Sequence, residues 1–97
     1  MALNIYWTRC ASVKFDSIIE YLEQNWGEQS TRKFVGEVYA LLDLLSIYPE
    51  VGPLQHEGRN IRGIVIVKQV TLFYKIENKN IVLLNFFGNP QHPKKKF

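Results

Sequence analysis

Two histidines are the side chains of this 97-residue sequence that titrate closest to neutral pH. His56 lies beside Glu57 in a glycine-containing stretch, and His92 lies between Pro90 and Pro93, ahead of three consecutive lysines. Metal-independent cleavage of RNA needs a base for the ribose 2′-hydroxyl, an acid for the leaving oxygen and cations for the phosphate. His56 and His92 are therefore the candidate catalytic residues for that reaction. The simpler alternative is that both are solvated surface histidines.

Basic side chains concentrate in the second half of the chain. Residues 1–50 carry four Lys or Arg against seven Asp or Glu, a balance of −3, whereas residues 51–97 carry eight against two, a balance of +6. A one-sided positive field suits an anionic partner, either a nucleic acid or an acidic peptide. The plainer alternative is a solubilising surface with a basic tail. The candidate target- or phosphate-binding residues are Arg59, Arg62, Lys68, Lys94, Lys95 and Lys96.

Several other kinds of site are not expected. Two histidines 36 residues apart lack the spacing of metal ligands, the single cysteine, Cys10, cannot form an intramolecular disulfide, and there is no glycine-rich phosphate loop. We therefore expect no metal and no cofactor. No apolar run approaches the roughly 20 residues that cross a membrane, and the first residues do not resemble a secretory signal. The expectation is a cytoplasmic protein without a membrane partner.

The first half of the chain has the pattern of a short strand followed by two helices. Leu3–Trp7 is apolar and aromatic, which favours a strand. Apolar residues then recur with the helical period of about 3.6 residues from 11 to 26 and again from 34 to 48. Gly27 separates these stretches, and Pro49 should end the second one. A helical hairpin is predicted.

The second half changes to the pattern of strands. Residues 50–60 contain two glycines and a proline and should form a loop, and the remainder from Gly88 should be irregular. The intervening stretches are rich in β-branched and aromatic residues and are separated by short polar breaks, which predicts an antiparallel meander of Ile61–Val67, Val70–Ile76 and Ile81–Phe87. The predicted fold is a single α+β domain over residues 1–97, in the order β-α-α-β-β-β, with the helical hairpin on one face of a mainly antiparallel sheet.

Two helices can cover only one face of such a sheet. Alternation along the strands assigns Ile61, Val65, Val67, Val70, Leu72, Tyr74 and Ile76 to the covered face. It assigns Arg62, Ile64, Ile66, Lys68, Thr71, Phe73 and Lys75 to the other face. An exposed apolar surface set with basic residues is typical of an interaction site. The tail or a second copy of the chain could instead cover it.

The order and spacing of many short pieces resemble the RelE/ParE superfamily of bacterial type II toxin–antitoxin toxins. The resemblance covers nearly the whole chain and rests on Trp7, Ala11, Ile18–Leu22, Trp26–Gly27, Phe34, Leu41–Leu42, Tyr48–Pro49, Gly52, Ile61–Arg62, Leu72–Ile76 and Pro93–Lys95. The fold of that superfamily, β-α-α-β-β-β, agrees with the order predicted from periodicity. The resemblance implies a plasmid-stabilisation type of protein that inhibits growth, is neutralised by a cognate antitoxin and forms a toxin–antitoxin hetero-oligomer.

Two modes of action exist in the family that the chain resembles. RelE-like members look like ribosome-dependent, metal-independent endoribonucleases that cut messenger RNA, whereas ParE-like members act on DNA gyrase without cutting RNA. The resemblance implies that antitoxin and target both use the uncovered sheet face. The candidate antitoxin-binding residues are therefore Ile64, Ile66, Phe73 and Lys75.

Two departures from the ribonuclease pattern favour the ParE-like mode. RelE-like enzymes typically carry an arginine before the Leu-Val-Tyr-like run, where this chain has Thr71, and another after the last strand, where residues 88–91 contain none. Guanidinium groups at those places would stabilise charge developing on the phosphate. A ParE-like or diverged toxin is therefore preferred over a RelE-like endonuclease. A non-toxic binding module on the same fold and an unrelated nucleic-acid-binding domain are the alternatives.

Overall fold

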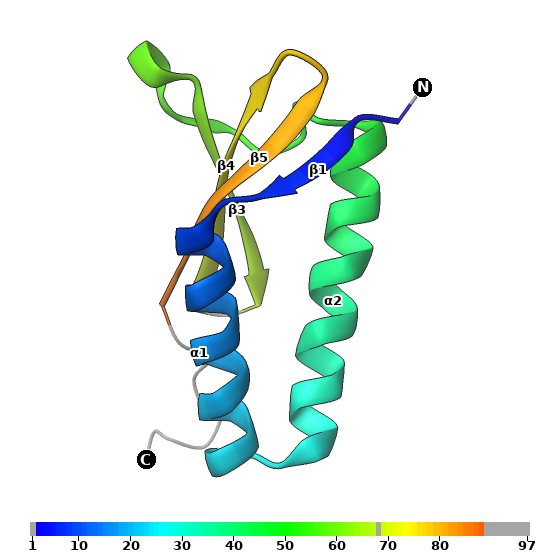
Figure 1. Cartoon of the computed structure of the whole chain (residues 1–97), viewed down its shortest axis with the longest axis vertical. Coiled ribbons are helices and arrows are strands. Elements are labelled where there is room, and N and C mark those ends of the chain that lie inside the picture. The colour runs from blue at the N-terminus through cyan, green and yellow to red at the C-terminus, as the bar shows by residue number, and fades with distance from the viewer. Residues whose placement is uncertain (1, 68, 89–97) are drawn as a thin grey trace.

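The computed structural model describes residues 2–67 and 69–88, and for residues 56 and 57 it describes the backbone only. These residues form β1 (Asn4–Trp7), α1 (Arg9–Asn25), α2 (Glu28–Ile47), β2 (Leu54–His56), a 3₁₀ turn (Glu57–Arg59), β3 (Ile61–Val67), β4 (Val70–Glu77) and β5 (Asn80–Phe87). The predicted order of helices and long strands is confirmed (Figure 1). The prediction of residues 50–60 as a plain loop is wrong, because β2 and the 3₁₀ turn lie within it.

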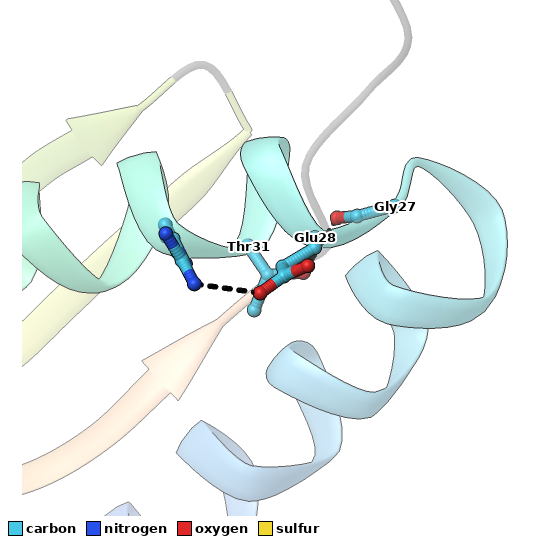
Figure 2. Close-up of polar contacts among 4 residues, drawn as sticks. Gly27, Glu28 and Thr31 are labelled. Carbon is cyan, nitrogen blue, oxygen red and sulfur yellow. Dashed lines mark hydrogen bonds and ion pairs between the residues drawn. The ribbon is translucent and has the colours of Figure 1, made fainter.

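The helical hairpin has a defined start and a defined hinge. Thr8 caps α1: its hydroxyl accepts a hydrogen bond from the Ala11 N–H at 3.2 Å and donates one to the Leu83 carbonyl at 2.7 Å, which joins the helix start to β5. Gly27, between the helices, has a φ of 91°, a value that favours glycine. The Thr31 hydroxyl donates to the Gly27 carbonyl at 2.9 Å, and Glu28 pairs with Arg32 at 2.7 Å (Figure 2). The chain therefore reverses at residue 27, as the sequence predicts.

The five strands of the described residues form one mixed sheet in the order β1-β5-β4-β3-β2. β1 runs parallel to β5, and the other three pairings are antiparallel. α1 and α2 lie side by side and antiparallel (Figure 1), and both pack on the same face of the sheet. The core between helices and sheet consists of Ala11, Phe15, Ile18, Leu22, Phe34, Val38, Leu42, Leu45, Val70, Leu72, Tyr74, Ile81, Leu83 and Phe86. No helix of the described segments is long and apolar enough to span a membrane.

A β-bulge in β3 reverses part of the face assignment made from the sequence. Val67 pairs with Val70, but the next pair is Val65 with Thr71, so Ile66 is an extra residue. Relative to Val67, one extra residue turns the side chains of residues 61–65 to the opposite face. Ile64 then lies opposite Leu72 and Arg62 opposite Tyr74, on the face that packs against the helices.

The placement of Arg62, Ile64 and Ile66 on the uncovered face is therefore wrong. Both isoleucines are half-buried and pack against the core. Ile61 and Val65 were expected to face the helices and instead lie opposite Lys75 and Thr71, on the uncovered side. The bulge accounts for all of these changes, because the alternation of β4 itself is as predicted, with Val70, Leu72 and Tyr74 fully buried.

The face away from the helices is called here the open face. Strand register places on it the side chains of Asn4, Tyr6, Ile61, Val65, Thr71, Phe73, Lys75, Glu77, Asn80, Val82, Asn85 and Phe87. A second bulge, at Leu84 in β5, allows Phe86 to face the core while Phe87 lies opposite Thr71 on the open face. The residues of the open face thus come from four neighbouring strands of the sheet, β1, β5, β4 and β3.

Candidate functional site

Phe73 lies at the centre of the open face. It is opposite Gly63 on β3, and a Cβ atom added to that glycine would lie 3.0 Å from the Phe73 Cε1 atom and 3.0 Å from the Gln55 Cγ atom. Both distances are shorter than side chains normally allow, so the Phe73 ring lies directly against the β3 backbone. Glycine at position 63 thus leaves space for the Phe73 ring, while the polar Asn85 lies opposite Phe73 on β5.

Exposed apolar side chains surround that centre. Tyr6 is 59% exposed, Val65 65% and Phe87 63%, and they come from β1, β3 and β5 respectively. Apolar side chains at this exposure, contributed by three different strands to one face, are typical of a surface that contacts another macromolecule. The sequence pattern does not place Tyr6 or Val65 on the open face, and it leaves Phe87 on either face of the last strand. Tyr6 could have been found from its place between Ile5 and Trp7, whereas Val65 and Phe87 depend on the two bulges.

The charge of the open face is small. The ammonium of Lys75 lies 3.4 Å from the carboxylate of Glu77, two residues further along β4, and both side chains are partly exposed. An exposed pair of this kind contributes little to stability, but it partly neutralises the cation. Of the four predicted antitoxin-binding residues, the structure places Phe73 and Lys75 on the open face and Ile64 and Ile66 on the covered one.

Arg62 and Tyr74 hold the loop that follows α2. One Nη of Arg62 donates to the carbonyls of Gly52 at 2.8 Å and Glu50 at 3.1 Å. The buried Tyr74 hydroxyl donates to the Pro49 carbonyl at 2.8 Å and accepts from the Gly52 N–H at 3.0 Å. Arg62 was predicted to bind phosphate or the target. In the structure, its guanidinium instead donates hydrogen bonds to two backbone carbonyls. Its role in target binding stays untested.

Of the remaining predicted site residues, the structure describes the side chain of Arg59 alone. Arg59 ends the exposed 3₁₀ turn, and the His56 backbone pairs with Ile61 at the sheet edge. The side chain of His56, together with Lys68, His92, Lys94, Lys95 and Lys96, lies outside the part of the chain that the structure describes. Their proposed roles in catalysis and phosphate binding remain predictions. Within the described residues, no three His, Cys, Asp or Glu side chains gather as a metal site would require.

Removing the Tyr74 hydroxyl should destabilise the protein. Tyr74→Phe leaves the Pro49 carbonyl and the Gly52 N–H without their shared partner, and an unpaired buried polar group costs about 1–3 kcal/mol. We expect the free energy of unfolding in urea to fall by that amount. Tyr48→Phe is the matched control, because the Tyr48 side chain is exposed, and it should change stability by less than about 0.5 kcal/mol. Equal losses in the two variants would contradict the anchoring role.

The same variant tests a pH dependence. Burial raises the pKa of Tyr74 above its ordinary value, although the Gly52 N–H and Arg62 oppose the shift. A raised pKa in the folded state favours the neutral phenol, so this stabilisation is complete below the unfolded pKa of about 10 and is lost as pH rises through the folded pKa. The stability difference between wild type and Tyr74→Phe should therefore shrink above about pH 10. A constant difference would show that Tyr74 ionises equally in both states.

The comparison with protein families decides what kind of protein this is. The model of the ParE toxin of type II toxin–antitoxin systems, parDE, matches residues 5–88. The chain belongs to the ParE toxin family. The match extends from β1 to the residue after β5, and therefore includes every strand of the open face. It confirms the resemblance to the RelE/ParE superfamily and the prediction of a toxin component of a type II toxin–antitoxin module.

Solved structures share the fold of this ParE-family toxin. The chromosomal ParDE system from P. aeruginosa matches with a TM-score of 0.74 at 16% identity, over 92% of this chain and 98% of that one. The YoeB/ParE toxin from Agrobacterium tumefaciens matches with a TM-score of 0.66 at 12% identity, over 91% and 100%. A copper-bound mutant toxin from Helicobacter pylori matches with a TM-score of 0.56 at 20% identity, over 89% and 93%. No match was found among curated proteins.

Proposed function

We propose that this ParE-family toxin acts by binding DNA gyrase rather than by cutting RNA, and that its cognate antitoxin neutralises it by covering the open face. The observation that carries the proposal is the set of apolar side chains next to Thr71. Thr71 lies between Val65 on β3 and Phe87 on β5, both apolar and exposed. A RelE-like ribonuclease would typically hold a phosphate-binding arginine at the position of Thr71.

The neighbours of Thr71 do not replace that arginine. Among the described residues of the open face, the one cation is Lys75, and it already pairs with Glu77. Cleavage of RNA develops negative charge on the phosphate, which needs preorganised cations or hydrogen-bond donors. An apolar surface with a paired lysine is better suited to burial against a protein than to phosphate chemistry. A protein target is therefore the better fit.

The apolar side chains of the open face also support the proposal that the antitoxin binds there. Tyr6, Phe73 and Phe87 are aromatic, and aromatic side chains are enriched in the buried centre of protein interfaces. The face spans four strands, which is wide enough for an extended or helical antitoxin segment to contact several of them. Target and antitoxin would then compete for one surface, which is a direct means of neutralisation.

A supercoiling assay tests the target. Purified toxin is added to gyrase and relaxed plasmid, and we expect supercoiling to fall as toxin is added and to recover when antitoxin is included. Phe73→Asp should be a weaker inhibitor, while Ile47→Asp, an exposed position at the end of α2, is the matched control for an added charge. Growth arrest on induction with unchanged supercoiling would reject gyrase. No growth arrest would favour the non-toxic binding module.

A further inference from the structure

A shallow, open surface pocket on the helix side of the molecule, called here the cavity, combines three aromatic rings with a carboxylate. It measures about 260 Å³ and is lined by Trp7, Ser12, Phe15, Asp16 and Tyr39. These residues come from the end of β1, the first half of α1 and the middle of α2. The cavity does not include any residue of the open face or any of the site residues predicted from the sequence.

The three aromatic rings that line the cavity differ in exposure: Tyr39 is half-exposed, Trp7 is partly buried and Phe15 is buried. Phe15 is 8% exposed, with its ring centroid 5.1 Å from that of Trp7 and 6.5 Å from that of Tyr39, and it also packs against Phe34 and Phe86 in the core. The rings of Phe15 and Tyr39 are nearly perpendicular, at 87°, and Tyr39 is 50% exposed at the rim. The face of an aromatic ring attracts a cation within about 6 Å of its centroid. Tyr39 and Trp7 offer ring surface to a bound cation, because Phe15 is enclosed by Trp7, Tyr39 and other core rings.

The charged side chain that lines the cavity, Asp16, is acidic, and acidic residues outnumber basic ones nearby, although Arg9 lies one helical turn from Ser12. Asp16 is exposed, and within the described residues it takes part in neither of the two ion pairs, Glu28–Arg32 and Lys75–Glu77. One helical turn from Asp16 lies Glu20, and one turn from Tyr39 lies Asp43. No Lys or Arg occupies the positions three or four residues from Asp16 or Tyr39, which are Ser12, Val13, Ile19, Glu20, Val35, Gly36, Leu42 and Asp43. The cavity is therefore set to receive a positive group.

We propose that this cavity binds the guanidinium group of an arginine presented by the antitoxin. A guanidinium is planar, stacks on aromatic rings and pairs with a carboxylate through two parallel hydrogen bonds, so it matches both features of the cavity. An ammonium would use the rings and the carboxylate as a point charge only. This proposal rests on the proposed neutralisation by an antitoxin and adds the chemistry of one contact.

The position of the cavity connects it to the open face. Tyr6 lies on the open face, and the next residue, Trp7, lines the cavity on the opposite side of β1. β1 is an edge strand, so no further strand of the described residues separates the two sides. An antitoxin segment that crosses the open face and passes around the β1 edge would therefore bring an arginine to Trp7, Tyr39 and Asp16.

A binding experiment with an arginine derivative tests the cavity without the antitoxin. The toxin is titrated with N-acetyl-arginine methylamide while the indole N–H resonances of Trp7 and Trp26 are followed by NMR. We expect a saturable shift at Trp7 and none at Trp26, which lines no part of the cavity. Asp16→Asn and Tyr39→Ala should each weaken binding by about 3- to 10-fold, and Tyr39→Phe should retain it because the ring remains.

A control variant and three possible outcomes decide whether the cavity binds arginine. Glu77→Gln removes a carboxylate from the β4–β5 hairpin and should leave arginine binding unchanged. The absence of a saturable Trp7 shift, an equal affinity in Asp16→Asn, or tighter binding of the matched lysine derivative would each reject an arginine site. Asp16 is exposed and forms no ion pair among the described residues, so the Asp16→Asn variant should fold normally.

A second arm uses the antitoxin and separates the two proposals. Asp16→Asn should lower antitoxin affinity by about 3- to 10-fold. If Trp7 responds to the arginine derivative but Asp16→Asn leaves antitoxin affinity unchanged, the arginine comes from another source and the antitoxin contact is rejected. If the chain binds no antitoxin and does not arrest growth, the proposed function fails even when the Trp7 response is seen.

Discussion

Phe73→Asp is expected to weaken the complex with the antitoxin by about 2–5 kcal/mol, which is roughly 30- to 4,000-fold in the dissociation constant. The Phe73 ring lies against the Gly63 backbone at the centre of the open face, so a covering partner would bury it. A carboxylate in that place would be desolvated, and Lys75, the nearest cation along β4, is already paired with Glu77. The effect on the complex should therefore exceed the effect on the free toxin.

Three further variants make this measurement specific. Phe73→Leu keeps the contact apolar and should retain most of the affinity. Val65→Asp adds a charge to the open face at a highly exposed position, so it should weaken the complex with little loss of stability in the free toxin. Ile47→Asp adds the same charge at the end of α2 and should leave affinity unchanged. Titration calorimetry with each variant, alongside urea unfolding of the free toxin, gives both quantities.

The opposite pattern would relocate the interface. If Phe73→Asp and Val65→Asp bind the antitoxin as tightly as the wild type while Ile47→Asp does not, the antitoxin covers the helical hairpin and the open face is left for another partner. If Phe73→Asp weakens binding only in proportion to its own loss of stability, the open face contributes structure and no contact.

The order of the main elements could be predicted from the sequence because their patterns are long. The period of α1 and α2 is maintained over several turns, and Gly27 and Pro49 mark the ends of α2. The three strands from β3 to β5 are dense in β-branched and aromatic residues and separated by short polar turns. β2 was not predicted because its three residues, next to Pro53, are too few to show the alternating pattern of a strand. They form a strand because they pair with β3.

The composition of the candidate site could be predicted only in part. Phe73 and Lys75 were correctly placed on the open face, since β4 alternates without interruption from Val70 to Tyr74; their contact with an antitoxin stays a prediction. Ile64 and Ile66 were placed on the wrong face, because the residue pattern of β3 is compatible with either face. The one-residue bulge at Ile66 decides which face each side chain takes. Arg62 has a sequence context that suits an anion, and its hydrogen bonds to Glu50 and Gly52 exist only once β3 and the loop are folded together.

On translating ribosomes, the purified toxin should cut messenger RNA at a rate at least about 10²–10³-fold below that of a RelE-like nuclease in the same assay, because loss of one preorganised charge-stabilising group typically costs that much. Thr71 stands where such a nuclease would hold arginine, and its neighbours across the sheet, Val65 and Phe87, offer no cation. The second arginine, expected after the last strand, is absent from residues 88–91. The two losses need not multiply, since groups that act together are not additive.

Primer extension measures this cleavage directly, with His56→Ala and His92→Ala alongside the wild type. Rapid cleavage by the wild type that either histidine change abolishes would overturn the expectation, because a histidine acting with nearby cations would then have replaced the two arginines. Rapid cleavage that survives both changes would also overturn it and would exclude the histidines as the catalytic pair. Cleavage that stays at the background level while induction arrests growth would leave the apolar open face around Thr71 as the means by which the toxin acts, through a protein target.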